Sequence, residues 1–367
     1  MPERDSKTVD VVIVGAGVIG LACAWRAAQR GLEVIVLERA APAAGATGVA
    51  AGMLAPVGEL TFGEQRLLEL TLEAAEGFIA FVAELEELSG EPTGFDRAGA
   101  LHVALDRDES EELRRRYALQ RSLGLDVEWL TPSRCRRLEP SLGTSIAGGV
   151  HAPGEGAVDP KALCAALLSA LERERVEVRS GATVTEAIIE GERIEGVRTE
   201  DGEEIRAAHV VLATGAWAGA SEWLPPEARP VVRPVKGQIL TLRGPVAEPV
   251  CERIVASERV YLVPRDDGRL LVGATVEERG FDASVTAGGV HELLREAYRL
   301  LPEVAELELV ETSAGLRPGT NDNLPLIGPG ALEGLVLATG HYRNGVLLAP
   351  LTADRVAELL VGAEVTA

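Results

Sequence analysis

The stretch that decides the fold is VDVVIVGAGVIGLACAWRAAQRGLEVIVLE, residues 9–38. Its first part, Val9–Val14, is a short valine-rich apolar run, which predicts a buried parallel strand. The motif GAGVIG follows at residues 15–20 and leads into a helical stretch, after which a second apolar strand ends in Glu38. A G-x-G-x-x-G motif in this order of strand, helix, strand and acid indicates dinucleotide binding.

Each glycine of the motif has its own physical role. Gly15 allows the tight turn, Gly17 lets the backbone approach a pyrophosphate, and Gly20 lets helix and strand pack closely. The N-terminus of the helix offers free N–H groups and a positive dipole end to the phosphates. Glu38 is placed to accept hydrogen bonds from a ribose hydroxyl. FAD and NAD are both compatible with this stretch taken alone.

Composition and charge narrow the class of protein. The chain has 367 residues, of which 46% are hydrophobic and 25% charged, which is typical of a globular enzyme with about two domains. The formal net charge is −21. A strongly acidic surface repels phosphate backbones and anionic lipids, so we expect neither nucleic acid nor a membrane surface as a partner.

The cysteines and the apolar runs bear on the cellular location. The four cysteines, at positions 23, 135, 164 and 251, form no CxxC pair and no metal-ligand spacing. We therefore expect reduced thiols, no metal site and a cytoplasmic protein. Residues 11–25 are apolar, but the glycine motif explains them better than a signal peptide does. No apolar run reaches the roughly 20 residues of a membrane span.

Elements of the nucleotide-binding type recur along the chain. HVVLATGAWA at residues 209–218 and GLVLATG at 334–340 each predict a buried strand that leads into a glycine turn, whereas residues 230–242 and 260–276 predict antiparallel strands. We therefore expect an α/β fold in which a Rossmann-type domain is interleaved with an antiparallel-sheet α+β substrate domain. The expected segments are 1–88, 153–226 and 311–367 for the nucleotide-binding domain, and 89–152 and 227–310 for the substrate domain.

Seven segments, in order, carry a resemblance that runs nearly end to end. The chain resembles the flavin-dependent amine oxidases of the D-amino acid oxidase family, and within it the bacterial glycine oxidases. The segments are VVIVGAGVIG (11–20), AAGML (50–54), ATGAWAG (213–219), PVKGQ (234–238), YLVPRDDGRLLVGAT (261–275), GLRPGTNDNLPLIG (315–328) and GHYRNGVLLAP (340–350).

The resemblance implies that the dinucleotide is FAD, held without a covalent bond. Sarcosine oxidases, which are similar, attach flavin through a Cys in the segment that reads SAGLRPG here, at residues 313–319, where this chain has none. In this family, Val184 would meet the adenine ring through its backbone. The implied FAD contacts are Gly15, Gly17, Val18, Ile19, Gly20, Glu38, Arg39, Ala46, Thr47, Ala51, Gly52, Met53, Val184, Gly215, His341, Tyr342, Arg343, Asn344, Gly345, Val346 and Leu347.

The resemblance also implies a substrate site. Arg317 in GLRPG would bind the substrate carboxylate, Tyr261 in VYLVPR would supply a hydroxyl, and Arg343 would lie near the substrate. A planar guanidinium binds a carboxylate through two parallel hydrogen bonds, which supports the role of Arg317. Members with larger substrates carry a lid tyrosine where this chain has Ser257, so small substrates are expected.

The implied reaction is oxidative deamination of glycine, sarcosine and small D-amino acids. The α-hydrogen would leave as hydride to flavin N5, and dioxygen would reoxidise the flavin to give hydrogen peroxide. No acid–base pair and no Ser/His/Asp set emerges from the sequence, which fits a reaction whose difficult step belongs to the cofactor. The imine would be hydrolysed or handed to a thiazole synthase in thiamine biosynthesis. A homo-oligomer is expected.

The end of the chain adds an electrostatic expectation. An amphipathic helix is expected at residues 346–361, directly after HYRNG. Its N-terminus carries about half a positive charge, so the backbone N–H groups of Gly345–Leu347 would stabilise an anionic reduced flavin.

Three alternatives stay open at this point. A dehydrogenase of the same fold would pass electrons to an acceptor other than oxygen, which a peroxide assay distinguishes. A tRNA-modifying flavoprotein module is opposed by the net charge of −21. A non-catalytic FAD-binding protein is opposed by the presence of Arg317.

Overall fold

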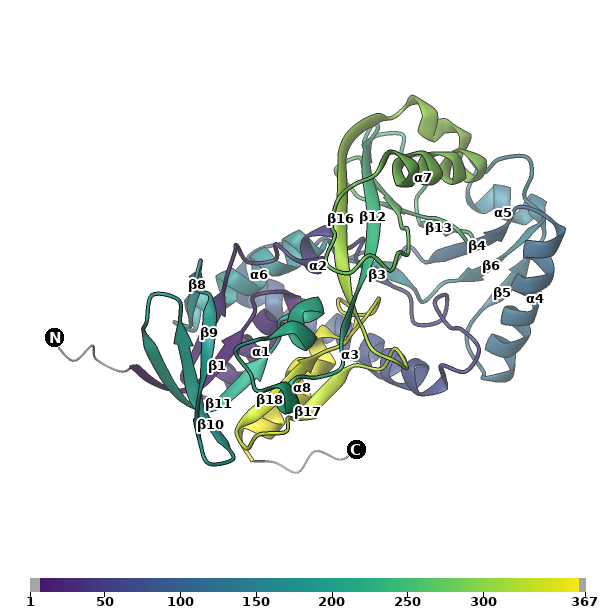
Figure 1. Ribbon diagram of the computed structural model, residues 1–367. Helices are drawn as coiled ribbons and strands as arrows, with labels where there is room; N and C mark the ends of the chain where they lie inside the picture. Colours follow the sequence, from purple (N-terminus) through teal and green to yellow (C-terminus); the bar gives the residue numbers. More distant parts are fainter. Residues whose placement is uncertain (1–6, 363–367) are drawn as a thin grey trace.

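The computed structural model describes residues 7–362, which form two lobes (Figure 1). Each lobe is built around one eight-stranded sheet. Two long strands, β12 (Arg233–Arg243) and β16 (Glu308–Gly319), belong to the second sheet and extend toward the first lobe (Figure 1). The observed mixture of a largely parallel sheet with an antiparallel one is the expected fold class.

The first sheet has the central order β17-β18-β11-β1-β2-β8, with a hairpin of β9 and β10 attached to β11. β1 pairs in parallel with both β2 and β11, and residues 11–13 are fully buried, as expected for a valine-rich strand inside a parallel sheet. The strands are β1 (Lys7–Val14), β2 (Val34–Glu38), β8 (Glu177–Ser180), β9 (Val184–Glu190), β10 (Arg193–Thr199), β11 (Glu204–Leu212), β17 (Leu326–Pro329) and β18 (Leu335–Thr339).

Four helices from distant parts of the chain share one core against this sheet. They are α1 (Val18–Gln29), α3 (Gln65–Ser89), α6 (Pro160–Arg173) and α8 (Ala349–Leu360). Trp25 packs edge-on against Phe81, with ring centroids 5.1 Å apart, and both lie in the same buried cluster as Leu163 and Val356. This shared core explains why the nucleotide-binding elements at the start, middle and end of the sequence come together.

The second sheet has the order β16-β12-β15-β14-β13-β4-β6-β5 and is antiparallel except where β13 pairs with β4. Its remaining strands are β4 (Ala100–Ala104), β5 (Glu128–Leu130), β6 (Gly148–Ala152), β13 (Ile254–Ala256), β14 (Tyr261–Pro264) and β15 (Arg269–Gly273). Helices of this lobe are α4 (Arg107–Ser122), α5 (Pro132–Leu138) and α7 (Ala287–Leu300). Short elements are α2 (Ala46–Val49), the pair β3 (Met53–Leu54) and β7 (Gly156–Ala157), and 3₁₀ turns at 215–220, 226–228 and 302–306.

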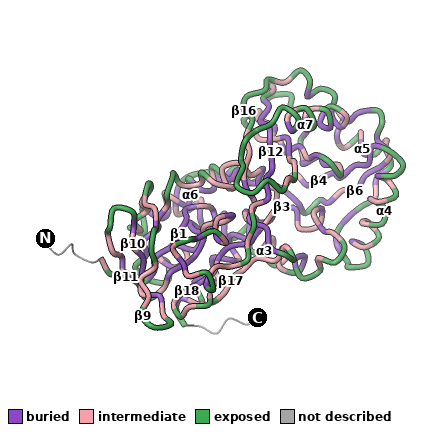
Figure 2. The backbone as a smooth tube through the Cα atoms, in the orientation of Figure 1, coloured by how far each residue is buried: buried purple, intermediate pink, exposed green. Residues whose placement is uncertain are grey.

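Two arginines of the second lobe contact the first lobe, one in β15 and one in the turn between β14 and β15. Arg269 donates to Asp159, the N-cap residue of α6, at 2.7 Å. Arg265 donates to the carbonyl oxygens of Ala51 and Val158. These hydrogen bonds fix the lobes to each other beside the loop that contains Ala51. Buried segments run through the interior of both lobes (Figure 2).

Two expectations about element positions need revision. The helix α8 begins at Ala349, not at Val346, and residues 345–348 form a turn. The reason is Pro350, which has no N–H and a fixed φ and therefore favours the first helical turn. The second expectation concerns residues 311–319, which the sequence places in the nucleotide-binding domain. Strand β16 continues to Gly319, so these residues pair with β12 in the second sheet.

Cysteine pairing, membrane spans and metal clusters can be examined over the same residues. All four cysteines are free and buried. Within residues 7–362, no helix is long and apolar enough to cross a bilayer. In that range, no group of three or more His, Cys, Asp or Glu side chains is arranged to hold a metal ion.

Candidate functional site

The glycine turn after β1 has the geometry that the motif predicts. Gly15 has φ +110°, and a Cβ there would lie 2.5 Å from the carbonyl oxygen of Ala213. Helix α1 begins directly after Gly17, which gives its N-terminus no side-chain cap. The first N–H of the helix, from Val18, donates to the Thr47 hydroxyl at 3.2 Å. Gly15 and Gly17 have no side chains, so the backbone of the turn can be approached closely by a ligand in the space beside it.

Glu38 closes this turn from the end of β2. Its carboxylate accepts hydrogen bonds from the backbone N–H groups of Ala16 and Ala40, each at 2.9 Å. The side chain is thus held at the same edge of the sheet as the glycine turn. Glu38 also lines the cavity described next, as its expected contact with a ribose requires.

One cavity of about 650 Å³ connects the glycine turn with the second sheet. Glu38, Arg39 and Val184 line one end of it, and Tyr261 and Arg317 line the other. Of the expected FAD contacts, Gly20, Asn344 and Leu347 do not line it; Gly20 instead packs against Gly15. The expected contacts that do line it are Gly15, Gly17, Val18, Ile19, Glu38, Arg39, Ala46, Thr47, Ala51, Gly52, Met53, Val184, Gly215, His341, Tyr342, Arg343, Gly345 and Val346.

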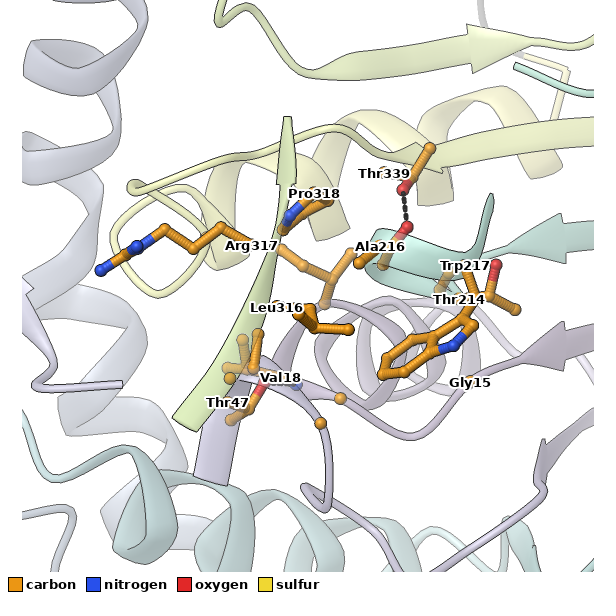
Figure 3. Close-up of a pocket in the computed structure, with 18 of the residues that line it drawn as sticks. Gly15, Val18, Thr47, Thr214, Ala216, Trp217, Leu316, Arg317, Pro318 and Thr339 are labelled. Atoms are coloured by element: carbon orange, nitrogen blue, oxygen red, sulfur yellow. Dashed lines mark hydrogen bonds between the residues drawn. The ribbon is translucent and has the colours of Figure 1, made fainter. Parts of the chain in front are cut away.

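Trp217 and Thr214 line the cavity and are among the residues of the segment ATGAWAG that the sequence interpretation did not single out. The indole of Trp217 lies beneath the guanidinium of Arg39, at 4.2 Å from ring centroid to Cζ. The hydroxyl oxygen of Thr214 is buried and has no hydrogen-bond partner among the described residues. Figure 3 places both side chains on the Gly15 side of the cavity. An aromatic surface and an unsatisfied hydroxyl fit a large, partly polar ligand there.

The site therefore fits FAD on its own geometry. The bare end of α1 and the glycine turn can hold a pyrophosphate, Glu38 can reach a ribose, and the cavity is long enough to connect that end with Tyr261 and Arg317. No cysteine lines the cavity. The group that would reach the second sheet is the flavin ring.

His341 serves the loop that precedes α8. Its side chain is 2% exposed, and its Nε2 lies 2.9 Å from the hydroxyl oxygen of Thr352 in α8. Burial lowers the pKa of His341 to about 3. The imidazole is therefore neutral near pH 7 and ties the loop to the helix.

Arg317 makes no ion pair with the residues that the structure describes, although its charge acts on Glu59, which lines the same cavity. It lies on β16, opposite Val235 of β12, and its Nη1 donates to the carbonyl oxygen of Thr275 at 3.1 Å. A second carbonyl oxygen, that of Lys236, lies 3.5 Å from the same nitrogen. No carboxylate between residues 7 and 362 lies within ion-pair distance of this guanidinium. Figure 3 shows its side chain extending away from Trp217. Such a group is suited to bind a carboxylate from a ligand.

Tyr261 lines the same end of the cavity. Burial raises the pKa of its phenol, and the positive charge of Arg317 counteracts only part of that effect. The hydroxyl therefore remains protonated near neutral pH. A protonated phenol beside a guanidinium can donate a second hydrogen bond to a bound carboxylate.

Two glycines that the sequence interpretation did not single out make room for these side chains. A Cβ on Gly237 would overlap the guanidinium of Arg317, and a Cβ on Gly273 would lie 2.5 Å from the Tyr261 hydroxyl. Both glycines sit in segments that carry the family resemblance, PVKGQ and LLVGAT. The contacts cross between strands, so only the register of the sheet reveals them.

Arg343 differs from Arg317 because it has acidic neighbours. Its Nε lies 3.9 Å from a Glu59 carboxylate oxygen, and its Nη2 lies 3.7 Å from one of Glu64. Glu59 lines the cavity, and burial raises its pKa despite the nearby Arg343 charge. The sequence interpretation missed Glu59. Arg343 thus shares its charge with the loop at residues 55–64.

The comparisons with known proteins can now be set beside this geometry. Residues 10–359 match the DAO family, described as FAD dependent oxidoreductase. The chain belongs to this family. This family is described as FAD-dependent oxidoreductases, so the expected family and cofactor are confirmed.

Relatives and solved structures extend the likeness. The chain is 39% identical over 96% of its length to the bifunctional protein ThiO/ThiG of Trichormus variabilis, and it spans 53% of that protein. It thus spans about half the length of such bifunctional relatives. It is 37% identical to the glycine oxidase of Geobacillus kaustophilus, covering 96% of this chain and 92% of that one. The crystal structure of Geobacillus kaustophilus glycine oxidase matches with a TM-score of 0.90 at 35% identity, covering 98% and 96% of the two chains.

Proposed function

We propose that this protein oxidatively deaminates glycine, and that sarcosine and small D-amino acids are further substrates. The observation that carries the proposal is Arg317: a guanidinium at the second-sheet end of the cavity, with Tyr261 beside it and no carboxylate of the described residues in an ion pair with it. Relatives named glycine oxidase support the same substrate class. The match to the one from Geobacillus kaustophilus covers 96% of this chain and 92% of that protein.

The residues orient the substrate. Two parallel N–H groups of Arg317 bind the carboxylate, and the hydroxyl of Tyr261 donates a further hydrogen bond, so the carboxylate is held in one plane. A small zwitterion has almost no apolar surface, so burial contributes little to its binding. Orientation by these two side chains therefore determines which face of the substrate α-carbon is presented to the cavity.

A bound FAD would supply the redox chemistry, a two-electron oxidation of the amine with dioxygen as the final acceptor and hydrogen peroxide as the second product. The remaining tasks fall to the protein. The backbone of the glycine turn would hold the pyrophosphate, and Gly345 and Val346 of the turn at residues 345–348 line the cavity. The neutral His341 keeps this turn attached to α8.

A substrate panel tests this function. Purified holoenzyme is mixed in air with glycine, sarcosine and D-alanine, and hydrogen peroxide is measured by a peroxidase-coupled dye. We expect peroxide in proportion to the substrate consumed. Flavin that is reduced by glycine without air but yields no peroxide in air indicates a dehydrogenase with another acceptor. Flavin that none of the three amines reduces contradicts the proposal.

The flavin is proposed to be non-covalent. No cysteine lines the cavity, and SAGLRPG at residues 313–319 contains none. Acid precipitation should therefore release all yellow colour into the supernatant. Colour that stays with the precipitated protein contradicts this part of the proposal.

A place in thiamine biosynthesis completes the proposal, with a cytoplasmic homo-oligomer as the working form. The bifunctional ThiO/ThiG relatives support a second protein that takes over the imine product. The edge strand β16 exposes Leu309 and Val310, which suits pairing with another copy. Light scattering tests the oligomer. Less free glyoxylate when a thiazole synthase is added supports the transfer, and unchanged glyoxylate contradicts it.

A further inference from the structure

The segment PVKGQ places two buried polar side chains beside the connection from β15 to α7. Lys236 and Gln238 are each 1% exposed, although lysine and glutamine are rarely fully buried. The connection, residues 274–286, contains Thr275 at its start and Thr286 at its end. Buried polar groups of this kind need partners, and this connection provides them.

Glu277 is where these partners meet. One of its carboxylate oxygens accepts hydrogen bonds from the Thr275 hydroxyl at 2.6 Å and from the Gln238 amide at 2.7 Å. The other lies 3.7 Å from the Lys236 ammonium. Burial alone would raise the pKa of Glu277, but these hydrogen bonds and the Lys236 charge outweigh it and hold the pKa below its usual range. The carboxylate is therefore ionised and fixed.

Thr275 is held from three sides. Its hydroxyl contacts Glu277 and also accepts the backbone N–H of Gln238 at 2.9 Å. The backbones of Lys236 and Glu277 exchange two hydrogen bonds, at 2.9 and 3.0 Å. At the far end, the Thr286 N–H donates to the Gln238 side chain at 2.8 Å. Together these hydrogen bonds leave the carbonyl oxygen of Thr275 little freedom to move.

We propose that Glu277 is a positioning residue: held by Lys236 and Gln238, it fixes the Thr275 carbonyl and thereby aims the Arg317 guanidinium at the substrate carboxylate. The link is the hydrogen bond from Arg317 to the Thr275 carbonyl at 3.1 Å, the shorter of the two that this guanidinium makes to backbone carbonyls. The inference rests on the proposed role of Arg317 as the carboxylate site. Glu277 itself does not line the cavity.

The first test compares variants at neighbouring acids. Glycolate binding to the FAD-loaded enzyme is followed through the flavin absorbance. Glu277→Ala should raise the Kd for glycolate about 10–100-fold, because a small misplacement of an orienting group has effects of that size. Glu277→Gln should recover much of this, since an amide oxygen can accept the same two hydrogen bonds. Glu278→Ala is the matched control, because Glu278 is exposed and paired with Arg233.

The second test separates positioning from general stability. In an Arg317→Lys background, Glu277→Ala should have little further effect on the Kd for glycolate, since the group it positions is gone. A merely structural role of Glu277 would raise the Kd for glycolate by the same factor with Arg317 and with Lys at this position. If Glu277→Ala yields no holoenzyme, Thr275→Val removes the hydroxyl that joins Thr275 to Glu277 and should give the same weakening.

The outcomes distinguish this inference from the proposed function. Wild-type enzyme that is reduced by glycine and binds glycolate, with Glu277→Ala and Thr275→Val within about twofold of it, overturns the inference alone. An equal factor in the Arg317→Lys background also overturns it. Wild-type enzyme that neither binds glycolate nor is reduced by glycine overturns the proposed function, and the inference with it.

Discussion

Gly273 lies directly opposite Tyr261 in the antiparallel pair of β15 and β14, and the phenol occupies the space that a side chain at Gly273 would need. A Cβ there would lie 2.5 Å from the hydroxyl oxygen. The two cross-strand residues therefore act as one unit, because the glycine makes room for the phenol although it offers no functional group.

We expect Gly273→Ala to weaken carboxylate binding while FAD stays bound. The added methyl must push the phenol aside, and one hydrogen bond worth about 0.5–1.5 kcal/mol is then lost from the substrate carboxylate. The measurement is the glycolate Kd of the holoenzyme. Gly288→Ala serves as the control, because Gly288 lies in α7 with no atom near its Cβ position. Equal affinity in both variants would show that Tyr261 does not contact the ligand.

The two site arginines should respond differently to truncation. Arg343 is near Glu59 and Glu64, so its charge is partly neutralised before any ligand binds. Arg343→Ala should therefore weaken glycolate binding by less than about 1 kcal/mol, whereas truncating an unpaired anchor such as Arg317 costs about 2–5 kcal/mol. Titration of both holoenzyme variants measures this difference. The reverse order would move the carboxylate anchor to Arg343.

Glu38→Ala should lower FAD affinity and leave the fold intact. The carboxylate accepts two backbone hydrogen bonds, from Ala16 and Ala40, and is expected to accept from a ribose hydroxyl. A hydrogen bond to a charged group is worth about 1.5–3 kcal/mol, so losing the one to the ribose should weaken FAD binding by that amount. Glu38→Gln should retain part of this binding energy. Fluorescence titration of the apoprotein with FAD gives the affinity. An unchanged FAD Kd in Glu38→Ala means that another group holds the ribose.

The ion pair between the lobes should give stability that acid removes. Burial raises the pKa of Asp159, but the hydrogen bond and charge of Arg269 outweigh it and place the pKa below its usual range. Because its pKa is lower in the folded state than in the unfolded state, ionised Asp159 stabilises the fold at pH values above its unfolded-state pKa, which is near about 4. This stabilisation is lost as the pH falls through the folded-state pKa.

Asp159→Asn keeps the N-cap oxygen of α6 but loses the charge. We expect the free energy of unfolding to fall by about 2 kcal/mol near pH 7, and the difference from wild type to shrink toward acid pH. Urea unfolding across this range measures it. Asp267→Asn is the control, since Asp267 also pairs with Arg269 but is half exposed. A difference that does not depend on pH would rule out the charge of Asp159 as its source.

The strand, glycine turn, helix and second strand of the nucleotide half could be predicted from the sequence because their signals are local. Residues 9–38 contain the whole unit, and Gly15, Gly17 and Glu38 take the places that their spacing indicates. Amphipathic periodicity predicts the last helix from Val346, whereas the structure begins it at Ala349, next to Pro350. The sequence places residues 311–319 in the nucleotide-binding domain, because no local feature shows that β16 pairs with β12.

The substrate half depends on contacts between distant residues. Gly237 and Gly273 clear space for side chains on neighbouring strands, and Glu59 reaches Arg343 across 284 positions of the sequence. Neither relation leaves a pattern in a single sequence. Arg317 could be named from its family motif. Only the fold shows that it makes no ion pair among the described residues, which is what indicates a role in ligand binding.

The central claim is that Arg317 orients a carboxylate substrate for oxidation, and anaerobic stopped-flow reduction of the bound flavin by glycine tests it most directly. We expect rapid bleaching in wild type, a loss of more than about 30-fold in kred/Kd for Arg317→Ala, corresponding to at least 2 kcal/mol, and partial recovery in Arg317→Lys. Flavin content should be the same in all three proteins. Reduction of Arg317→Ala within about threefold of wild type, a difference below roughly 1 kcal/mol, would contradict the account.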